Sequence, residues 1–307
     1  MIVLAGQTAS GKTDLAVALA EKIDAEIICA DSRQVYRQLD AGTAKPSAAQ
    51  RASVRHWLLD CADPGETFDA SRWAKEASAA AADIRTRGKI PLVCGGTGLY
   101  LRALLEGLSP LPPRDEAVRA RLAAEAESLD REALHARLAA ADPEAAAGIA
   151  PANLQRVLRA LEVLELTGKP ISAHWRKGRD GGVRATLTLC LNLSPELSRE
   201  RIKSRASAMW PDLLSEVKSL VPGEFSGREP GFTSLGYREA LACARGQTPC
   251  DEGLAQMIRG TVAYAKRQRT WLRNQLDASE LDADAGGGAL LTRALKLWEK
   301  TRDKAAA

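Results

Sequence analysis

The chain has 307 residues, of which 45% are hydrophobic and 27% charged, and its formal net charge is +4. These values are typical of a globular protein with one large domain or a core and a smaller attachment, and they argue against a membrane protein. No apolar run approaches the roughly 20 residues of a membrane helix. The first apolar run leads directly into a glycine-rich loop with no signal-like segment, so we expect a cytoplasmic protein.

The six cysteines and three histidines are dispersed along the chain. None of them forms the short-spaced pairs that structural zinc sites use. We therefore predict no metal site built from cysteine and histidine, and we expect the thiols to be reduced.

Strand and helix patterns alternate in the first third of the chain. Strand patterns occupy residues 2–5, 26–31 and 89–95, and helical patterns occupy residues 12–23 and 70–87. This alternation predicts an α/β fold with a parallel, P-loop NTPase-like sheet flanked by helices. Ligands of such sheets gather at the carboxyl ends of the strands, and all three strands end in polar or glycine-rich motifs.

A proline-rich stretch at residues 109–113 predicts a boundary, and the residues that follow, to about Gly168, have helical periodicity without a strand pattern. We interpret them as an inserted all-helical smaller domain. Alternating apolar residues return at residues 183–192, which predicts a strand that rejoins the sheet. The expected organisation is a core of residues 1–111 and 183–307 around an insertion at residues 112–182.

The last part of the chain has two long helical patterns, at residues 196–220 and 253–276. Residues 285–288 are expected to form a loop before a short final helix. Two stretches, residues 155–205 and 259–273, are rich in basic residues. On their own they are compatible with solvated helix faces or with nucleic-acid binding.

Residues 6–13 match the P-loop pattern Gly-x-x-x-x-Gly-Lys-Thr in full, between a strand and a helix. Backbone N–H groups and the helix dipole would hold a di- or triphosphate, Lys12 would reach its outer phosphates, and the Thr13 hydroxyl would bind Mg²⁺. The pattern does not reveal whether the phosphate is transferred or leaves. The predicted phosphate contacts are Gly6, Gln7, Thr8, Ala9, Ser10, Gly11, Lys12 and Thr13.

Asp31 ends the second predicted strand, and two roles for it remain open. A strand-terminal carboxylate in a P-loop protein can hold Mg²⁺ or its water. It can also act as a general base, a contribution of ~10²–10⁴-fold. Two other features are equally open from the residues alone, because Gly95–Gly98 could be only a tight turn and Arg205 only a surface residue.

Six further motifs, in this order along nearly the whole chain, resemble those of bacterial tRNA dimethylallyltransferases, the IPP transferase family. They are Asp31-Ser-Arg-Gln-Val-Tyr36, Gly42-Thr-Ala-Lys-Pro46, Gly95-Gly-Thr-Gly-Leu-Tyr100, Asn153-x-x-Arg156-x-x-Arg159-Ala-Leu-Glu162, Ser234-Leu-Gly-Tyr-Arg238 and Tyr264-Ala-Lys-Arg-Gln268. The chain departs from the family pattern at Gln7, where proline is usual, and at Trp57, which follows His56 in place of a second histidine.

The resemblance implies transfer of a dimethylallyl group from dimethylallyl diphosphate to the exocyclic N6 of the adenine 3′-adjacent to the tRNA anticodon, with release of diphosphate and Mg²⁺ as cofactor. Asp31 would accept the N6 proton, and Thr97 would lie close to the acceptor nucleotide. Lys12 and Arg205 would contact the diphosphate. No obligate protein partner is implied.

The resemblance also implies three groups of tRNA contacts. The first lies around the target base and comprises Asp31, Ser32, Arg33, Gln34 and Thr97. The second lies in the helical insertion and comprises Arg119, Gln155, Arg156, Val157, Leu158 and Arg159. The third lies in the second part of the core and comprises Thr233, Ser234, Leu235, Gly236, Tyr237, Arg238, Lys266, Arg267, Gln268, Arg269, Thr270, Trp271, Leu272 and Arg273. Trp271 could stack on a base or be buried on the apolar face of its helix.

Three alternatives remain at this point. A P-loop small-molecule kinase needs the same phosphate cradle, and an isopentenyltransferase acting on free adenine nucleotide needs the same chemistry without RNA. A non-enzymatic RNA-binding module would leave the P-loop and Asp31 unexplained.

Overall fold

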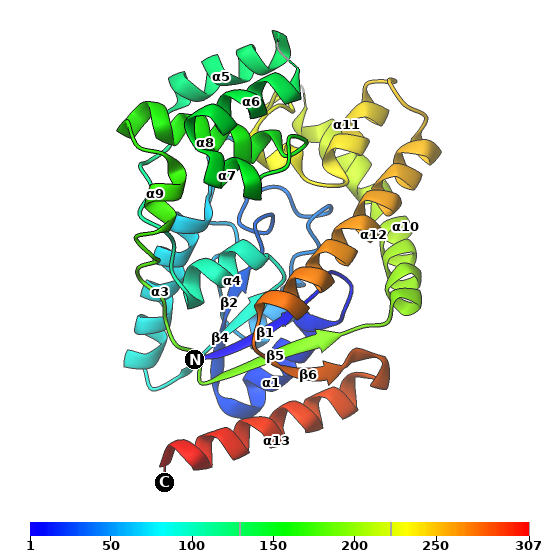
Figure 1. The fold of residues 1–307 in the computed structure, drawn as a ribbon. Coiled ribbons are helices and arrows are strands. Elements are labelled where there is room, and N and C mark those ends of the chain that lie inside the picture. Colours follow the sequence, from blue (N-terminus) through cyan, green and yellow to red (C-terminus); the bar gives the residue numbers. More distant parts are fainter. Residues whose placement is uncertain (129, 222, 307) are drawn as a thin grey trace. The chain divides into compact units, whose positions relative to one another are not determined.

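The computed structural model describes residues 1–306 apart from 129 and 222 (Figure 1). Its contacts divide the chain into two compact units, one formed by Met1–Leu105 with Val183–Ala307 and the other by Glu106–Gly182. The smaller unit therefore begins somewhat earlier than residue 112 and ends at residue 182. None of the helices in the described residues is long and apolar enough to cross a membrane.

In the described part of the chain, the larger unit contains a six-stranded sheet with the order β3-β2-β4-β1-β5-β6, and its neighbouring strands are parallel. The predicted P-loop-like α/β fold is thereby confirmed. The strands are β1 (Ile2–Gly6), β2 (Ala25–Ala30), β3 (His56–Trp57), β4 (Ile90–Gly95), β5 (Leu187–Asn192) and β6 (Ser279–Asp282).

The helices of the larger unit are α1 (Lys12–Ile23), α2 (Ala48–Ser53), α3 (Ala70–Thr86), α4 (Gly98–Leu105), α10 (Pro195–Leu220), α11 (Tyr237–Ala244), α12 (Cys250–Gln275) and α13 (Gly287–Ala306). Two short 3₁₀ turns, η1 (Pro230–Thr233) and η2 (Ala283–Ala285), lie in the connections. Within the larger unit, helices cover the sheet, and α10, α11 and α12 extend beyond the carboxyl ends of its strands (Figure 1).

Both β1 and β2 are fully buried, which explains why their residues are apolar except for Glu26, whose carboxylate is paired with Arg87. Ile2, Leu4 and Ile27 form one hydrophobic cluster with residues of α1 and α13. Helix α3 packs on β2 and β4, and its buried Trp73 donates from Nε1 to the carbonyl oxygen of Cys29 over 2.9 Å. This packing fixes the strand ends from which the site is built.

The end of the chain corrects two predictions. The final helix is not short, because α13 runs over Gly287–Ala306 and buries Leu290 and Ala294 against the core. Strand β6 was not predicted, because only its Leu281 is buried and an edge strand with one apolar residue has no readable alternation. The two-residue strand β3 was missed for the same reason.

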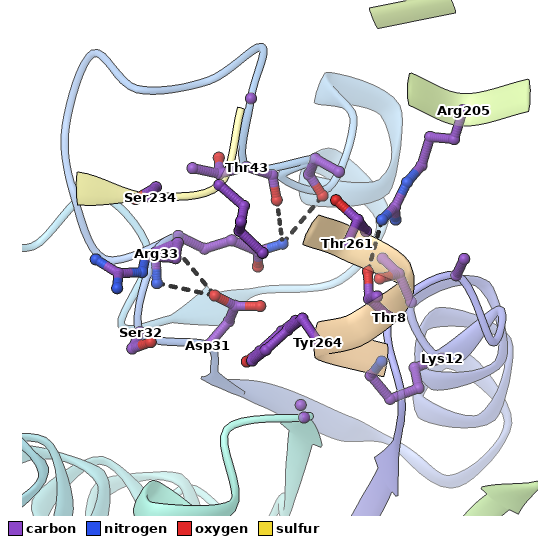
Figure 2. Close-up of a pocket in the computed structure, with 18 of the residues that line it drawn as sticks. Thr8, Lys12, Asp31, Ser32, Arg33, Thr43, Arg205, Ser234, Thr261 and Tyr264 are labelled. Carbon is purple, nitrogen blue, oxygen red and sulfur yellow. Dashed lines mark hydrogen bonds between the residues drawn. The ribbon is translucent and has the colours of Figure 1, made fainter. Parts of the chain in front are cut away.

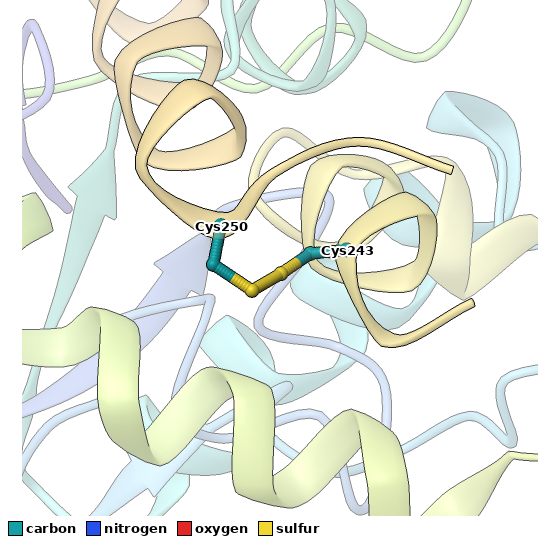
Figure 3. Close-up of a disulfide and its surroundings, with 2 residues drawn as sticks. All are labelled: Cys243 and Cys250. Atoms are coloured by element: carbon teal, nitrogen blue, oxygen red, sulfur yellow. A yellow bond between two sulfur atoms is a disulfide. The ribbon is translucent and has the colours of Figure 1, made fainter. Parts of the chain in front are cut away.

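A disulfide joins Cys243 to Cys250, so the expectation that all thiols are reduced is wrong for this pair (Figure 3). Cys243 lies in α11 and Cys250 is the first residue of α12. The short connection between the two helices brings their Cα atoms to 5.2 Å, within the range that a disulfide requires. Sequence spacing alone did not reveal this proximity, which depends on how α11 and α12 pack.

The smaller unit is all-helical in its described residues, as predicted for the insertion. Its core gathers apolar side chains from these helices, among them Leu122, Leu138, Val157 and Leu161. The helices are α5 (Glu116–Ser128), α6 (Arg131–Ala141), α7 (Pro143–Gly148), α8 (Leu154–Thr167) and α9 (Ile171–Trp175).

Candidate active site

A cavity of about 480 Å³ lies in the larger unit, where β1, β2 and β4 end. Its walls come from the P-loop, the segment after β2, the loop after β4, helices α10 and α12, and the residues before α11. Figure 2 shows side chains from these segments converging on one space. The site therefore lies where a parallel sheet is expected to bind its ligand.

The P-loop leads into an uncapped helix N-terminus. Gly11 precedes α1 with φ 86°, and no side chain caps this helix, so its first N–H groups remain available to a ligand. Gly6 allows close packing, because a Cβ atom there would lie 2.9 Å from Ser10 Oγ. The loop thus presents backbone donors at the positive end of a helix dipole.

Two cations border the loop. The Lys12 Nζ donates to the Gln7 carbonyl oxygen over 2.7 Å, and the Arg205 Nη2 donates to Thr8 Oγ1 over 2.6 Å. Burial lowers the pKa of Lys12 and also the pKa of Arg205. Neither cation forms an ion pair with any described residue. The charge of Asp31, in the same cavity, opposes this lowering of the pKa for both cations. Two positive charges without a salt bridge to any described residue suit an anionic ligand.

Asp31 follows β2 and faces the same cavity (Figure 2). Its Oδ1 accepts hydrogen bonds from the backbone N–H groups of Arg33, over 2.8 Å, and Gln34, over 3.4 Å. No described residue donates a hydrogen bond to Oδ2. One oxygen thus fixes the carboxylate in a turn and the other remains able to accept a proton.

Thr97 and Tyr264 lie beside Asp31. The backbone N–H of Ser32 donates to Thr97 Oγ1 over 3.1 Å, and the Thr97 N–H donates to the Ala30 carbonyl oxygen over 3.2 Å. Burial, followed by the negative charge of Asp31, raises the pKa of Tyr264 to about 12, while a hydrogen bond with Thr97 opposes this shift. Thr97 supports the cavity wall without lining it.

Sequence reasoning did not assign a role to Tyr264. Met257, Thr261, Tyr264 and Gln268 all line the cavity from α12. Their spacing of four, three and four residues places them on one helical face, and this stripe is the sequence signal that could have identified Tyr264.

The structure also shows how the segments around Asp31 are held. Gln34 donates from Nε2 to the carbonyl oxygens of Thr43, over 3.2 Å, and Ala44, over 3.0 Å. Arg33 donates from Nη1 to Thr233 Oγ1 over 3.3 Å. Both side chains therefore bind other walls of the site.

The residues predicted around α11 and α12 fall into two groups. Tyr237 is fully buried, donates to Glu216 over 2.6 Å and accepts from the Gly42 N–H over 3.1 Å. Trp271 packs against Gly98, so closely that a Cβ atom there would lie 2.5 Å from the indole ring. Trp271 itself is half-buried, and Gln268 and Leu272 are buried. Among these predicted contacts, those that line the cavity are Thr233, Ser234, Leu235, Arg267 and Gln268. The exposed side chains are those of Arg238, Lys266, Arg267, Thr270 and Arg273. Gly236 caps α11, and Arg269 is half-buried.

In the smaller unit, Arg119 and Arg159 both contact the buried carboxylate of Glu162, over 3.3 Å and 2.9 Å. Val157 belongs to the hydrophobic core, with Leu158 packed against it. Gln155 and Arg156 are exposed at the start of α8. Among the tRNA contacts predicted in the smaller unit, only Gln155 and Arg156 have exposed side chains.

The described residues contain no group of three or more His, Cys, Asp or Glu that could enclose a metal ion. The residues present do fit a magnesium ion bound through a substrate phosphate, because Thr13 and Asp31 line the same cavity. Mg²⁺ typically takes one or two protein oxygens together with phosphate oxygens and water. His56 also lines the cavity, but its Nδ1 bonds to the Val54 carbonyl oxygen, and burial lowers its pKa.

The fold and the cavity define a P-loop protein whose phosphate-binding motif and strand-end carboxylate share one cavity. The chain belongs to the IPP transferase family, whose model matches residues 34–275. It is 47% identical over 275 residues to a tRNA dimethylallyltransferase of Anaeromyxobacter sp. (strain Fw109-5), a match that covers 90% of this chain and 92% of the relative.

Solved structures agree with this assignment. The full-length tRNA isopentenylpyrophosphate transferase of Bacillus halodurans is 32% identical with a TM-score of 0.71, over 100% of this chain and 99% of that one. A eukaryotic dimethylallyltransferase, described as acting on tRNA, is 28% identical with a TM-score of 0.75, over 92% of this chain and 73% of that one.

Proposed function

We propose that the protein transfers the dimethylallyl group of dimethylallyl diphosphate to N6 of the adenine 3′-adjacent to the anticodon of a tRNA, releasing diphosphate. The names of its relatives support this substrate pair. The observation that carries the proposal is a pair of cations, Lys12 and Arg205, that form no salt bridge with any described residue and share one cavity with the carboxylate of Asp31.

The P-loop end of the cavity stabilises the leaving group. As the allylic C–O bond breaks, negative charge accumulates on the diphosphate, and donors already in place lower the barrier by stabilising that charge. The backbone N–H groups at the start of α1, the ammonium of Lys12 and the guanidinium of Arg205 are these donors. Because neither cation forms a salt bridge with a described residue, no such pair has to break before the diphosphate binds.

Thr13 is the residue that would hold magnesium, together with oxygens of the diphosphate. Bound there, the ion would add positive charge at the leaving group. The Thr13 hydroxyl lies at the first turn of α1, and its place is set by the same turn that positions Lys12.

Asp31 accepts the proton that N6 loses as the new N–C bond forms. The N6 amine is a weak nucleophile because its lone pair is delocalised into the ring, so removal of the proton must accompany attack. The Arg33 and Gln34 N–H groups hold Oδ1, and Oδ2 is left for the adenine. A general base of this kind contributes ~10²–10⁴-fold.

The target adenine must leave its stack to enter an enclosed cavity, at a cost of a few kcal/mol that is smallest in a single-stranded loop. Ser32, Arg33 and Gln34 would surround the base, and Thr97 would hold Ser32 from behind the cavity wall. Exposed side chains would hold the RNA backbone, and their contribution would weaken with salt. In the larger unit these are Arg238, Lys266, Arg267, Thr270 and Arg273, and in the smaller unit Gln155 and Arg156.

Two experiments test this proposal. In the first, labelled dimethylallyl diphosphate is incubated with tRNA or with free AMP or ATP. In the second, ATP is incubated with candidate metabolites. Label in tRNA alone is the expected result. Label in free nucleotide would indicate a nucleotide isopentenyltransferase, and a phosphorylated metabolite without labelled RNA would indicate a kinase. Either of these two results contradicts the proposal.

A further inference from the structure

Gln268 connects two walls of the cavity with a single side chain. It lies on α12 and is only 7% exposed. Its Oε1 accepts a hydrogen bond from the backbone N–H of Thr8 over 2.8 Å, and its Nε2 donates to the carbonyl oxygen of Gly96 over 2.8 Å. The P-loop and the loop after β4 are thus joined through one amide group.

The chemistry of its partners fixes the orientation of this amide. An N–H of Thr8 requires an acceptor and a carbonyl of Gly96 requires a donor, so rotating the amide by half a turn would break both bonds. The approach also depends on glycine at position 96. A Cβ atom there would lie 2.5 Å from Gln268 Nε2 and 2.7 Å from the Gly6 carbonyl oxygen.

The two ends of the amide contact different parts of the site, one at the proposed diphosphate site and the other near the proposed place of the acceptor adenine. Thr8 receives the hydrogen bond of Arg205 at the leaving-group end (Figure 2). Gly96 precedes Thr97, which accepts from the N–H of Ser32, next to the base Asp31. The leaving-group donors and the acceptor side of the cavity therefore share one rigid connection.

We propose that Gln268 is a positioning residue that sets the separation between the diphosphate and the attacking adenine, and that its side chain does not contact tRNA. This inference rests on the proposed transfer reaction. Its side chain is buried, and its oxygen and one of its two N–H groups are already engaged in joining the two loops. Misplacement of reacting groups by about 1 Å can cost ~10²-fold in rate.

Two substitutions separate the two bonds. Gln268→Leu keeps most of the volume and removes both. Gln268→Glu retains the acceptor for Thr8 but places a carboxylate oxygen against the Gly96 carbonyl oxygen, and only a protonated carboxyl group can donate there. The rate of the glutamate variant should therefore recover toward that of the wild type as the pH is lowered. A residue with a purely structural role in α12 would not produce such a profile.

The test compares single-turnover transfer rates, tRNA dissociation constants and melting temperatures of the full chain. We expect Gln268→Leu to be ~10–100-fold slower than wild type with a tRNA dissociation constant within about twofold of it. Gln256→Leu makes the same chemical change at an exposed position of α12 and should match wild type in all three measurements.

Three results would overturn the inference: a wild-type transfer rate in Gln268→Leu, a loss of tRNA affinity that accounts for the slower rate, or a glutamate variant whose rate relative to wild type does not change with pH. Absence of transfer by the wild-type chain would instead contradict the proposed function. In that case the dissociation constant of inorganic diphosphate tests the inference. Displacement of Thr8 in Gln268→Leu should weaken diphosphate binding several-fold. Unchanged binding would refute the connection between Gln268 and the P-loop.

Discussion

Replacing Arg205 by alanine should impair catalysis without destabilising the fold. The guanidinium makes one hydrogen bond, to Thr8 Oγ1, and no ion pair with any described residue. Burial lowers its pKa, which means that the folded protein disfavours its charge. A cation whose charge stabilises the fold would have a raised pKa in the folded protein. The substitution therefore separates a role in ligand binding from a role in stability.

The size of the effect follows from the charges in the cavity. Two opposite unit charges about 4 Å apart attract by ~4 kcal/mol at an effective dielectric constant of about 20. The alanine variant also loses the cost of desolvating the cation, so we expect a net loss of ~2–4 kcal/mol in transition-state binding. At about 1.4 kcal/mol per factor of ten, kcat/KM for dimethylallyl diphosphate should fall ~30–1000-fold. The free energy of unfolding should stay within about 0.5 kcal/mol of wild type or rise.

The assay measures kcat/KM at saturating tRNA and the urea unfolding curve of the same preparations. Lys203→Ala removes a charge of the same sign from an exposed position of α10 and should alter neither quantity. Arg205→Lys keeps the charge without the planar fork and should fall between alanine and wild type. A variant Arg205→Ala that is destabilised but retains wild-type kcat/KM would show that Arg205 supports the helix and not the diphosphate.

Three further predictions concern other charged groups. Asp31→Asn keeps the turn but cannot take a proton, so transfer should slow by at least ~10²-fold while the tRNA dissociation constant changes less than several-fold; undiminished turnover would remove Asp31 from the role of base. Burial lowers the pKa of Lys12. As the pH rises, Lys12 therefore loses its charge at a lower pH than an ordinary lysine does. The alkaline decline of kcat/KM for dimethylallyl diphosphate should therefore disappear in Lys12→Met, and an identical decline in both proteins would contradict the assignment. The hydrogen bond from Arg87 lowers the pKa of Glu26 from 4.5 to about 2, which adds stability above pH 4.5 that is lost as the pH falls toward 2. Because Arg87 is 34% exposed, we expect Glu26→Gln to cost about 2 kcal/mol at pH 7, less than the ~3 kcal/mol of the full shift, and an equal cost near pH 2 would exclude this origin.

Much of the larger unit could be predicted because its signals are local. The apolar run of β1, the P-loop and the helical spacing of α1 occur consecutively, and the structure has them at nearly the predicted residues. Edge strands such as β6 carry almost no local signal, since pairing with β5 and burial of a single leucine define them. Tertiary packing alone determined the length of α13 and the proximity of Cys243 to Cys250.

The residues of the site also differ in whether a local motif could predict them. Lys12 and Asp31 follow directly from motifs at strand ends, whereas Arg205 could be suggested only by resemblance, because its approach to Thr8 depends on how α10 packs. Motif membership also did not distinguish exposed side chains from buried ones. Lys266 and Gln268 are two residues apart, yet the first is exposed and the second is engaged within the protein.

The central claim is that this P-loop holds a diphosphate that leaves from carbon and is not a donor of phosphoryl groups. Dimethylallyl diphosphate that carries a heavy oxygen isotope between its carbon and phosphorus tests it most directly, with tRNA as the acceptor and mass spectrometry of both products. The account predicts that all of the heavy oxygen leaves in diphosphate and that the digested tRNA contains adenosine alkylated at N6. Heavy oxygen retained with the dimethylallyl group, or a phosphorylated acceptor, would contradict it.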